Sequence, residues 1–325
     1  PEGGAGLFKA AFLHQVARVF DIGERGGGEA EEKGKRAKKG HLGLLLALLG
    51  APAVAQPITA EDFIAFDADQ ARIGQLLFYD KILSGNRNIS CATCHHALTG
   101  TGDGLALPVG EGGRGLGVTR DAGAGPDAVH ERVPRNAPQL FNLGAREFSR
   151  MFQDGRAQPH PAYPSGLETP AGYDLPHGLD NVLAAQAMFP GTSGTEMAGQ
   201  PGENRVADAA AAGDLTAVWT QLAARLRDIP GYVDQFVAVF PDVHSAADIE
   251  FLHAANAIAA FEASAWRADN SPFDRFLRGE RSAMSRAALA GMRIFYSPRK
   301  GNCASCHAGI FQTDHSFRAI AMPQV

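Results

Sequence analysis

The chain has 325 residues, of which 45% are hydrophobic and 20% are charged, and its formal net charge is −5. This composition is typical of a globular protein and excludes a disordered or collagen-like chain. The acidic balance argues against a nucleic-acid-binding protein, which would need a basic face. The length suffices for about two domains, each with a core of its own.

The N-terminal part contains a pattern that is typical of a secretory signal. Basic residues between positions 33 and 39 precede an apolar run over residues 42–51, and Ala53-Val54-Ala55 offers small residues for cleavage. The apolar run is shorter than the ~20 residues that span a membrane. We therefore expect a signal peptide over residues 33–55 rather than a stable membrane anchor, preceded by an unassigned extension over residues 1–32.

Apolar residues recur at helical spacing in four segments of the remaining chain. In chain order, these segments cover residues 73–77, 215–226, 249–255 and 288–296. Asp214 and Ser285 precede two of them and are suitable N-caps. Strict apolar–polar alternation is scarce, which predicts an all-α fold. Long loops rich in glycine and proline, chiefly over residues 100–127 and 155–180, are typical of segments that wrap a cofactor.

All four cysteines lie in two copies of one pentapeptide. The copies are Cys91-Ala92-Thr93-Cys94-His95 and Cys303-Ala304-Ser305-Cys306-His307. This is the attachment pattern of c-type haem, in which the thiols add to two vinyl groups and the histidine binds the iron. Paired zinc-ribbon cysteines are usually ~15–20 residues apart, disulfides would not require the histidine, and a thioredoxin-like site would need strands. We therefore expect two covalent c-type haems.

The surroundings of the first motif predict an open iron with an acid–base group nearby. Residues 97–129 contain no histidine and no methionine, so the nearest candidate for a sixth ligand is His130, in a polar loop. An open iron suits peroxide chemistry, which needs a group that moves a proton between the two oxygens. Glu196 lies among small and apolar residues, where burial would raise the pKa of its carboxyl. The alternative is a surface glutamate that caps a helix.

Several further segments match the pattern of one known family. They are Arg135-Asn136-Ala137-Pro138, Asp154-Gly155-Arg156, Glu196-Met197, Ile229-Pro230-Gly231-Tyr232, Ala260-Phe261-Glu262 and Asn270-Ser271-Pro272-Phe273-Asp274. With the two haem motifs, they resemble the bacterial di-haem cytochrome c peroxidase and MauG family over most of residues 57–325. The resemblance implies two cytochrome-c-like helical domains, each enclosing one covalent haem. With a composition shift over residues 199–213, it suggests a peroxidatic domain at 57–205 and an electron-transfer domain at 206–325.

The same resemblance implies roles for individual residues. The first haem would be the peroxidatic one, and Glu196 matches the catalytic glutamate of the family. Gln186 and Pro190 match residues that line its distal pocket, Gln186 as part of the catalytic set and Pro190 as a haem contact. Asn136 matches a ligand of a calcium ion between the haems. The chain departs from the family at Gln153, where a tryptophan often stands, and it lacks the distal histidine that some peroxidases place after the first motif.

Three functions follow from this pattern. The first is a secreted, periplasmic peroxidase that reduces hydrogen peroxide to water with electrons from a small donor such as cytochrome c or a cupredoxin. The second is a MauG-like enzyme that oxidises residues of a partner protein, and the third is a di-haem electron carrier without enzymatic activity. The family also suggests a homodimer. The resemblance also implies that the sixth ligand of the second haem, a methionine or tyrosine, comes well after the second motif, so we expect it beyond Val325.

Overall fold

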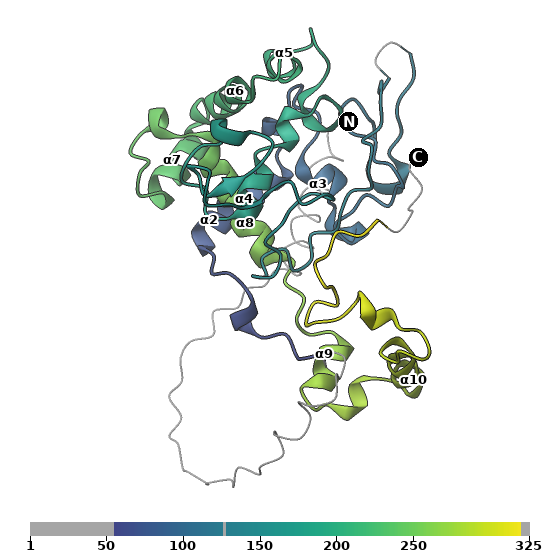
Figure 1. The fold of residues 1–325 in the computed structure, drawn as a ribbon. Coiled ribbons are helices and arrows are strands. Elements are labelled where there is room, and N and C mark those ends of the chain that lie inside the picture. Colours follow the sequence, from purple (N-terminus) through teal and green to yellow (C-terminus); the bar gives the residue numbers. More distant parts are fainter. Residues whose placement is uncertain (1–54, 126–127, 320–325) are drawn as a thin grey trace, which may run out of the picture. The chain divides into compact units, whose positions relative to one another are not determined.

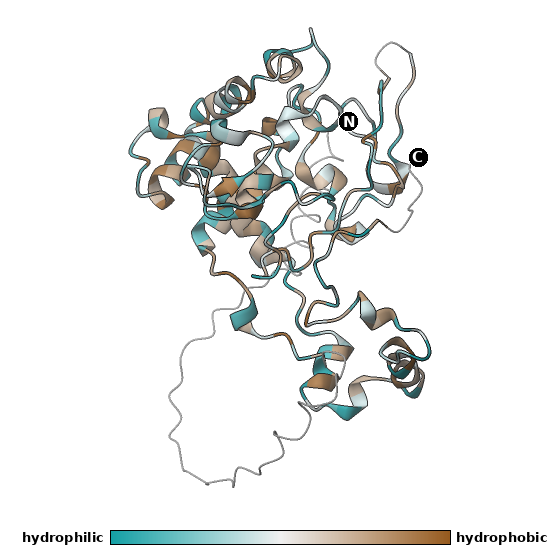
Figure 2. Ribbon diagram, in the orientation of Figure 1, coloured by the Kyte–Doolittle hydropathy of each residue, from teal (hydrophilic) through white to brown (hydrophobic). Residues whose placement is uncertain are grey.

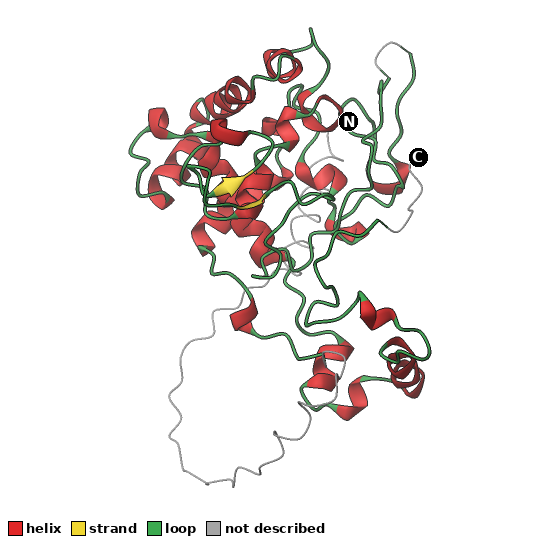
Figure 3. Ribbon diagram, in the orientation of Figure 1, coloured by secondary structure: helices red, strands yellow, loops and turns green. Residues whose placement is uncertain are grey.

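The structure of the protein is a computed structural model that describes residues 55–125 and 128–319, which belong to one compact unit, Ala53–Val325. Helices and long loops build this unit (Figure 1), and Figure 3 shows a single small pair of strands. The expected extension over residues 1–32 and residues 33–54 of the expected signal peptide lie outside the described residues. Among the residues described, no helix is long and apolar enough to cross a membrane.

The predicted helical class is confirmed for this unit. Its longer helices are α2 (Ala68–Tyr79), α6 (Leu215–Arg227), α7 (Pro230–Val239), α8 (Phe251–Ala265) and α10 (Arg286–Phe295). Its shorter helices are α3 (Cys91–Cys94), α4 (Val182–Ala187), α5 (Arg205–Ala211) and α9 (Pro272–Leu277). The strands β1 (Gln158–Pro159) and β2 (Leu167–Glu168) form a short antiparallel pair within the loop expected over residues 155–180.

Side-chain caps fix the starts of two of these helices. The Asp214 carboxylate accepts a hydrogen bond from the amide of Ala217 at 2.9 Å, and the Ser285 hydroxyl accepts one from the amide of Ala288 at 3.1 Å. Each bond satisfies an amide that has no partner within the first helical turn. Both predicted N-caps are confirmed, and they explain why α6 and α10 begin where they do.

One hydrophobic core joins the helices from α2 to α8. It contains buried residues from Ile73 to Trp266, and Figure 2 shows the apolar character of α8 at its centre. This core runs across the expected domain junction at residues 205 and 206, because the alanine-rich segment there forms α5 and packs against α6. The division into two haem domains, with its junction at residues 205 and 206, stays a prediction.

Candidate functional site

The first Cys-X-X-Cys-His motif forms a single helical turn, α3, that ends at its histidine. The His95 amide donates to the Cys91 carbonyl at 2.9 Å, so the two cysteines, three residues apart, lie on one side of the turn. The His95 Nδ1 lies 3.0 Å from the carbonyl of Thr101, which can only accept a hydrogen bond. Nδ1 is therefore the protonated nitrogen, and Nε2 is the nitrogen available to bind a metal.

Burial keeps the side chains of this motif uncharged. It raises the pKa of the Cys91 thiol to about 12 and that of Cys94 to about 11, and it lowers the pKa of His95. A neutral imidazole can bind iron, and a thiol that resists ionisation is a poor ligand for zinc. All four cysteines of the chain are free, and within residues 55–125 and 128–319 no three His, Cys, Asp or Glu side chains converge as a metal site would require. The first motif thus fits a covalently attached haem.

Glu196 lies on a π-helical turn, Gly194–Ala198, that main-chain contacts hold in place. The carbonyl of Ser193 accepts hydrogen bonds from the amides of Glu196, Met197 and Ala198 at 3.2, 3.0 and 2.9 Å. Such turns put one extra residue into a helix and are frequent at functional sites. The main-chain hydrogen bonds within this turn therefore define the position of the Glu196 backbone.

Two glycines let neighbouring loops touch this turn. The Gly85 amide donates to the Met197 carbonyl at 2.7 Å, and a Cβ on Gly85 would lie 1.7 Å from the Ala198 oxygen. On the other side, a Cβ on Gly110 would lie 1.8 Å from the Thr195 oxygen. Any side chain at either position would push the turn away. The loop that leads into the first motif and the glycine loop after it therefore both fix the position of Glu196.

The Glu196 carboxyl is suited to hold a proton next to the first motif. It is half-buried, and its oxygens accept no hydrogen bond from any residue that the structure describes. Burial raises its pKa, and the charge of Arg156 opposes that rise. Its own charge acts on Cys94 and raises the pKa of that thiol. The turn thus brings Glu196 within electrostatic reach of the first motif, as a catalytic acid–base group would require.

The segment that precedes this turn carries the other two predicted pocket residues. Gln186 lies in the last turn of α4 and Pro190 begins a 3-10 turn, and both are half-buried. The indole of Trp219 donates to the Met188 carbonyl at 2.8 Å and anchors this segment to α6. The structure therefore places Gln186, Pro190 and Glu196 on successive turns of one short stretch of chain. No hydrogen bond joins the side chains of these three described residues.

Two buried side chains that sequence reasoning missed shape the loop after the first motif. The Arg120 guanidinium donates to the carbonyls of Val109 at 2.5 Å, Gly110 at 2.5 Å and Gly115 at 3.0 Å. Glu111 accepts hydrogen bonds from the amides of two asparagine side chains, Asn86 at 2.8 Å and Asn88 at 2.5 Å. Residues 110–115, which match the spacing Gly-x-Gly-x-x-Gly, thus form a structural loop. An arginine that follows five closely spaced glycines over residues 110–117 was the only signal in the sequence.

The loop before the first motif is held from α6. Arg225 donates to the carbonyls of Ile82 at 3.0 Å, Ser84 at 2.5 Å and Gly85 at 2.9 Å. These main-chain acceptors would otherwise be partly buried without partners. Arg225 therefore ties α6 to the same glycine that touches the Glu196 turn.

The second motif repeats the local geometry of the first in more exposed surroundings. The His307 amide donates to the Cys303 carbonyl at 2.9 Å, and the His307 Nδ1 lies 3.3 Å from the carbonyl of Gln312. His307 is exposed, and none of the residues of α10 in front of it is buried. The motif fits an attached haem, whose faces are apolar and would cover the apolar side of α10.

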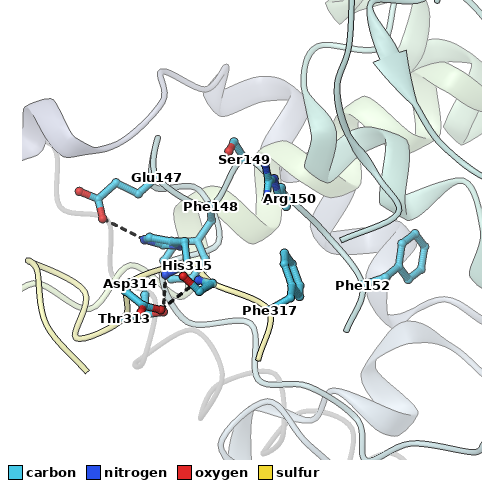
Figure 4. A pocket seen from close by; sticks show the side chains of 10 residues that line it. Glu147, Phe148, Ser149, Arg150, Phe152, Thr313, Asp314, His315 and Phe317 are labelled. Carbon is cyan, nitrogen blue, oxygen red and sulfur yellow. Dashed lines mark hydrogen bonds and ion pairs between the residues drawn. The ribbon is translucent and has the colours of Figure 1, made fainter. Parts of the chain in front are cut away.

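The chain after the second motif lies against the segment that precedes Gln153. The two line a pocket of 790 Å³ (Figure 4), and the His315 Nε2 lies 3.0 Å from the carboxylate of Glu147. The His315 ring also packs edge-on against Phe148. Because Glu147 takes its Nε2, His315 is not free to bind iron in this arrangement. The pocket shows that the two halves of the described chain meet beside Gln153.

The calcium prediction at Asn136 finds no further support among the described side chains. The Asn136 amide donates to the Leu105 carbonyl at 2.5 Å, and Asn136 itself is exposed. No convergent set of carboxylates surrounds it in the described ranges. A calcium ion at Asn136 stays a prediction.

The comparisons with known proteins identify the family. A family model described as di-haem cytochrome c peroxidase matches residues 68–282, more than half of the chain, and the chain belongs to this family. The match ends before the second haem motif, which begins at Cys303. The family is one of di-haem proteins, so haem is the cofactor that membership implies.

Individual relatives agree with this assignment. The chain is 28% identical over 267 residues to the cytochrome c peroxidase of Escherichia coli. The aligned region covers 82% of this chain and 42% of that protein. It is 27% identical over 255 residues to the methylamine utilization protein MauG of Methylophilus methylotrophus, with 78% and 57% covered. The chain thus spans about half the length of these curated relatives. A crystal structure of a MauG-like protein associated with microbial copper homeostasis shares the fold, with a TM-score of 0.52 at 22% identity, and 85% and 63% of the chains covered.

Proposed function

We propose that this protein is a secreted di-haem peroxidase that reduces hydrogen peroxide to water beside its first motif. The observation that carries the proposal is the state of the Glu196 carboxyl. It has no hydrogen-bond partner in the described chain, burial raises its pKa, and it lies within electrostatic reach of Cys94. A haem attached to Cys91 and Cys94, with His95 as ligand, would supply an iron that binds peroxide and exchanges electrons. A second haem on Cys303, Cys306 and His307 would receive electrons singly.

In this proposal Glu196 moves one proton between the two oxygens of peroxide. The Glu196 carboxylate takes the proton from the oxygen nearer the haem and delivers it to the farther oxygen. The O–O bond then breaks, and the farther oxygen leaves as water. Two electrons and two further protons complete the balance, H₂O₂ + 2 e⁻ + 2 H⁺ → 2 H₂O. A raised pKa suits this exchange, because the group must both accept and release a proton near neutral pH.

The remaining roles follow from the same proposal. We assign Gln186 to orienting peroxide and Pro190 to shaping the pocket wall, since both precede Glu196 on the anchored segment. The electron donor would be a small protein such as cytochrome c or a cupredoxin. Export to the periplasm, a calcium ion at Asn136 and a homodimer belong to the proposal as well. The junction of the two haem domains would fall at residues 205 and 206.

The decisive experiment compares Glu196→Gln with a matched control, Glu168→Gln, in the haem-loaded protein. Glu168 is also half-buried, but it bonds to Gln158 at 2.7 Å in the short hairpin. We expect E196Q to keep both haems and to react with peroxide about 10² to 10⁴ times more slowly in stopped flow, while E168Q reacts as the wild type does. Equal rates in E196Q and wild type would remove Glu196 from the mechanism.

The same experiment separates the alternative functions. Reduced cytochrome c is added after one equivalent of peroxide, and its oxidation is followed. Rapid oxidation supports the peroxidase, whereas a long-lived oxidised state that ignores the donor favours oxidation of a partner protein. A protein with two loaded haems and no spectral response to peroxide would be an electron carrier.

A further inference from the structure

Two buried carboxylate oxygens have no hydrogen-bond partner in the described parts of the chain, one on Asp103 and one on Glu262. The two residues differ in whether a hydrogen bond or a nearby cation stabilises the carboxylate. The other oxygen of Asp103 accepts a hydrogen bond from the Leu105 amide at 2.9 Å, and Arg120 lies within electrostatic reach. Glu262 has neither, although its side chain is only 6% exposed. A buried carboxylate without a partner or a cation is costly, so Glu262 needs a physical explanation.

No hydrogen bond and no neighbouring charge offsets the burial of Glu262. Glu262 lies on α8, against which α2, α4 and α6 pack. The charged or titratable groups of these helices are Asp69, Arg72 and Tyr79 on α2, Arg225 and Arg227 on α6, and His253 on α8. None of them acts on Glu262, and burial alone raises its pKa to about 8. The group therefore takes the proton itself at neutral pH and loses it only in mildly alkaline solution.

The charged neighbours on these helices are engaged elsewhere. Asp69 and Arg72 pair with each other at the surface, and Arg227 donates to the Ile249 carbonyl at 2.8 Å. His253 lies 3.2 Å from the carboxylate of Asp242. The ionisable group on which Glu262 does act is Cys91 of the first motif, whose pKa the charge of Glu262 raises. Glu262 is thus linked electrostatically to the first haem attachment site.

We propose that Glu262 is a redox-linked proton-binding site of the first haem centre, which in mildly alkaline solution takes up a proton when that centre is reduced and releases it when the centre is oxidised. An electron that enters a site of low dielectric constant stabilises a nearby proton, because the two charges attract strongly there. The electron comes from the donor protein, and the proton passes from water to the Glu262 carboxylate. The inference rests on the proposed haem at Cys91 and Cys94.

The test is a redox titration of the first haem between pH 6 and pH 10, in wild type and in Glu262→Gln. At pH 6 the two proteins should have equal potentials, because both side chains are neutral. Above pH 8 the ionised Glu262 should make the wild type about tenfold harder to reduce than E262Q, which is about 59 mV for one electron. The same pH dependence in both proteins would overturn the proposal.

The control variant is Glu196→Gln, since Glu196 is the other carboxyl that acts on the first motif with a raised pKa. The plot of reduction potential against pH should change slope near pH 8 in E196Q, as in wild type, and should lose this change of slope in E262Q. Infrared difference spectra of reduced minus oxidised protein at pH 9 should gain a protonated carboxyl band in wild type and E196Q. If E262Q does not fold, the infrared spectra of wild type and E196Q still test the proposal. Absence of the protonated carboxyl band from both would overturn it.

Haem content separates the failure of this inference from that of the proposed function. Peptide mass spectrometry shows whether haem is attached to Cys91 and Cys94. A chain without that haem would overturn the proposed function and this inference together. A loaded chain that consumes peroxide through Glu196 but has a potential indifferent to Glu262 would overturn this inference alone.

Discussion

The two Cys-X-X-Cys-His motifs have the same local geometry and different surroundings. In both, the histidine amide donates to the first cysteine carbonyl at 2.9 Å, and Nδ1 faces a main-chain carbonyl a few residues onward. The first motif has Ala92 and Thr93 buried in a core that reaches to Trp266, whereas α10 beside the second motif buries no residue. The pentapeptide therefore determines where a haem attaches, and the surrounding chain determines what that haem can do.

The contrast extends to electrostatics. Glu196, Glu262, Asp103 and Arg120 act on the first motif, and burial shifts the pKa of both its cysteines upward. A solvent-exposed site is screened by water, so the same groups around the second motif would have much weaker effects. A site with several desolvated ionisable groups suits proton-coupled chemistry, and an exposed one suits exchange of electrons with another protein. Four predictions would break or sharpen this comparison.

The largest effect should come from removing each motif in turn. Cys91→Ala with Cys94→Ala should abolish the reaction with peroxide, because the acid Glu196 then has no haem beside it. Cys303→Ala with Cys306→Ala should keep that reaction and lose the rapid oxidation of a donor protein. Haem stoichiometry and stopped-flow spectra check both variants. Peroxide reactivity in the first variant would show that we have assigned the two haems in the wrong order.

The second prediction concerns Glu262 and the stability of the first core. Its pKa is raised from 4.5 to about 8 in the folded chain, so the folded state binds the proton more tightly than the unfolded state. The contribution of Glu262 to stability is therefore fully present at low pH and lost as pH rises to 8. Relative to Glu262→Gln, wild type should lose about 1.4 kcal/mol of unfolding free energy per pH unit across this range. Urea unfolding at pH 5 and pH 8 measures it, and a constant difference would contradict it.

Third, Gly110→Ala should disturb the Glu196 turn from a distance. Its Cβ would lie 1.8 Å from the Thr195 oxygen, which belongs to the main chain and cannot rotate away. We expect a loss of about 1–3 kcal/mol in unfolding free energy and a slower reaction with peroxide at unchanged haem content. An active enzyme of wild-type stability would show that this contact does not position the acid.

The smallest effect should come from Gly291→Ala in α10, beside the second motif. A Cβ at Gly291 meets no described atom within 4 Å, and the residue lies inside a helix. Alanine should raise the unfolding free energy by about 0.5–1 kcal/mol and leave the peroxide rate unchanged. Thermal unfolding of G291A and G110A side by side gives the comparison, and destabilisation by G291A would mean that α10 is more tightly packed than described here.

The sequence was sufficient where local chemistry decides the structure. Asp214 and Ser285 were predictable caps, because a short polar side chain before an amphipathic stripe serves a helix start in any fold. The pentapeptides were equally local. The pair β1–β2 was not predictable, since strands of two residues have no detectable period. The junction expected at residues 205 and 206 stays a prediction, and the alanine-rich segment beside it, which has the composition of a linker, forms the helix α5.

The missed site residues depend on packing between distant segments. Glu262 was part of a recognised motif, but its lack of a partner becomes visible only when α2, α4 and α6 are placed around α8. Arg120 and Arg225 bind main-chain carbonyls, which every residue has, so nothing in the sequence marks their acceptors. The candidate acid Glu196 was predictable as a residue, whereas the two loops that fix its turn were not.

The contacts of the Glu196 turn with Gly85 and Gly110 have a consequence for how such proteins diverge. Main-chain contacts with these two glycines hold the turn, in addition to the burial of the Met197 side chain in the core. Substitutions at two glycines that lie far away in the chain should therefore disturb the turn as directly as substitutions within it. A search for distant members of this group would do better to weigh those glycines together with the glutamate than to score the short segment around the glutamate alone.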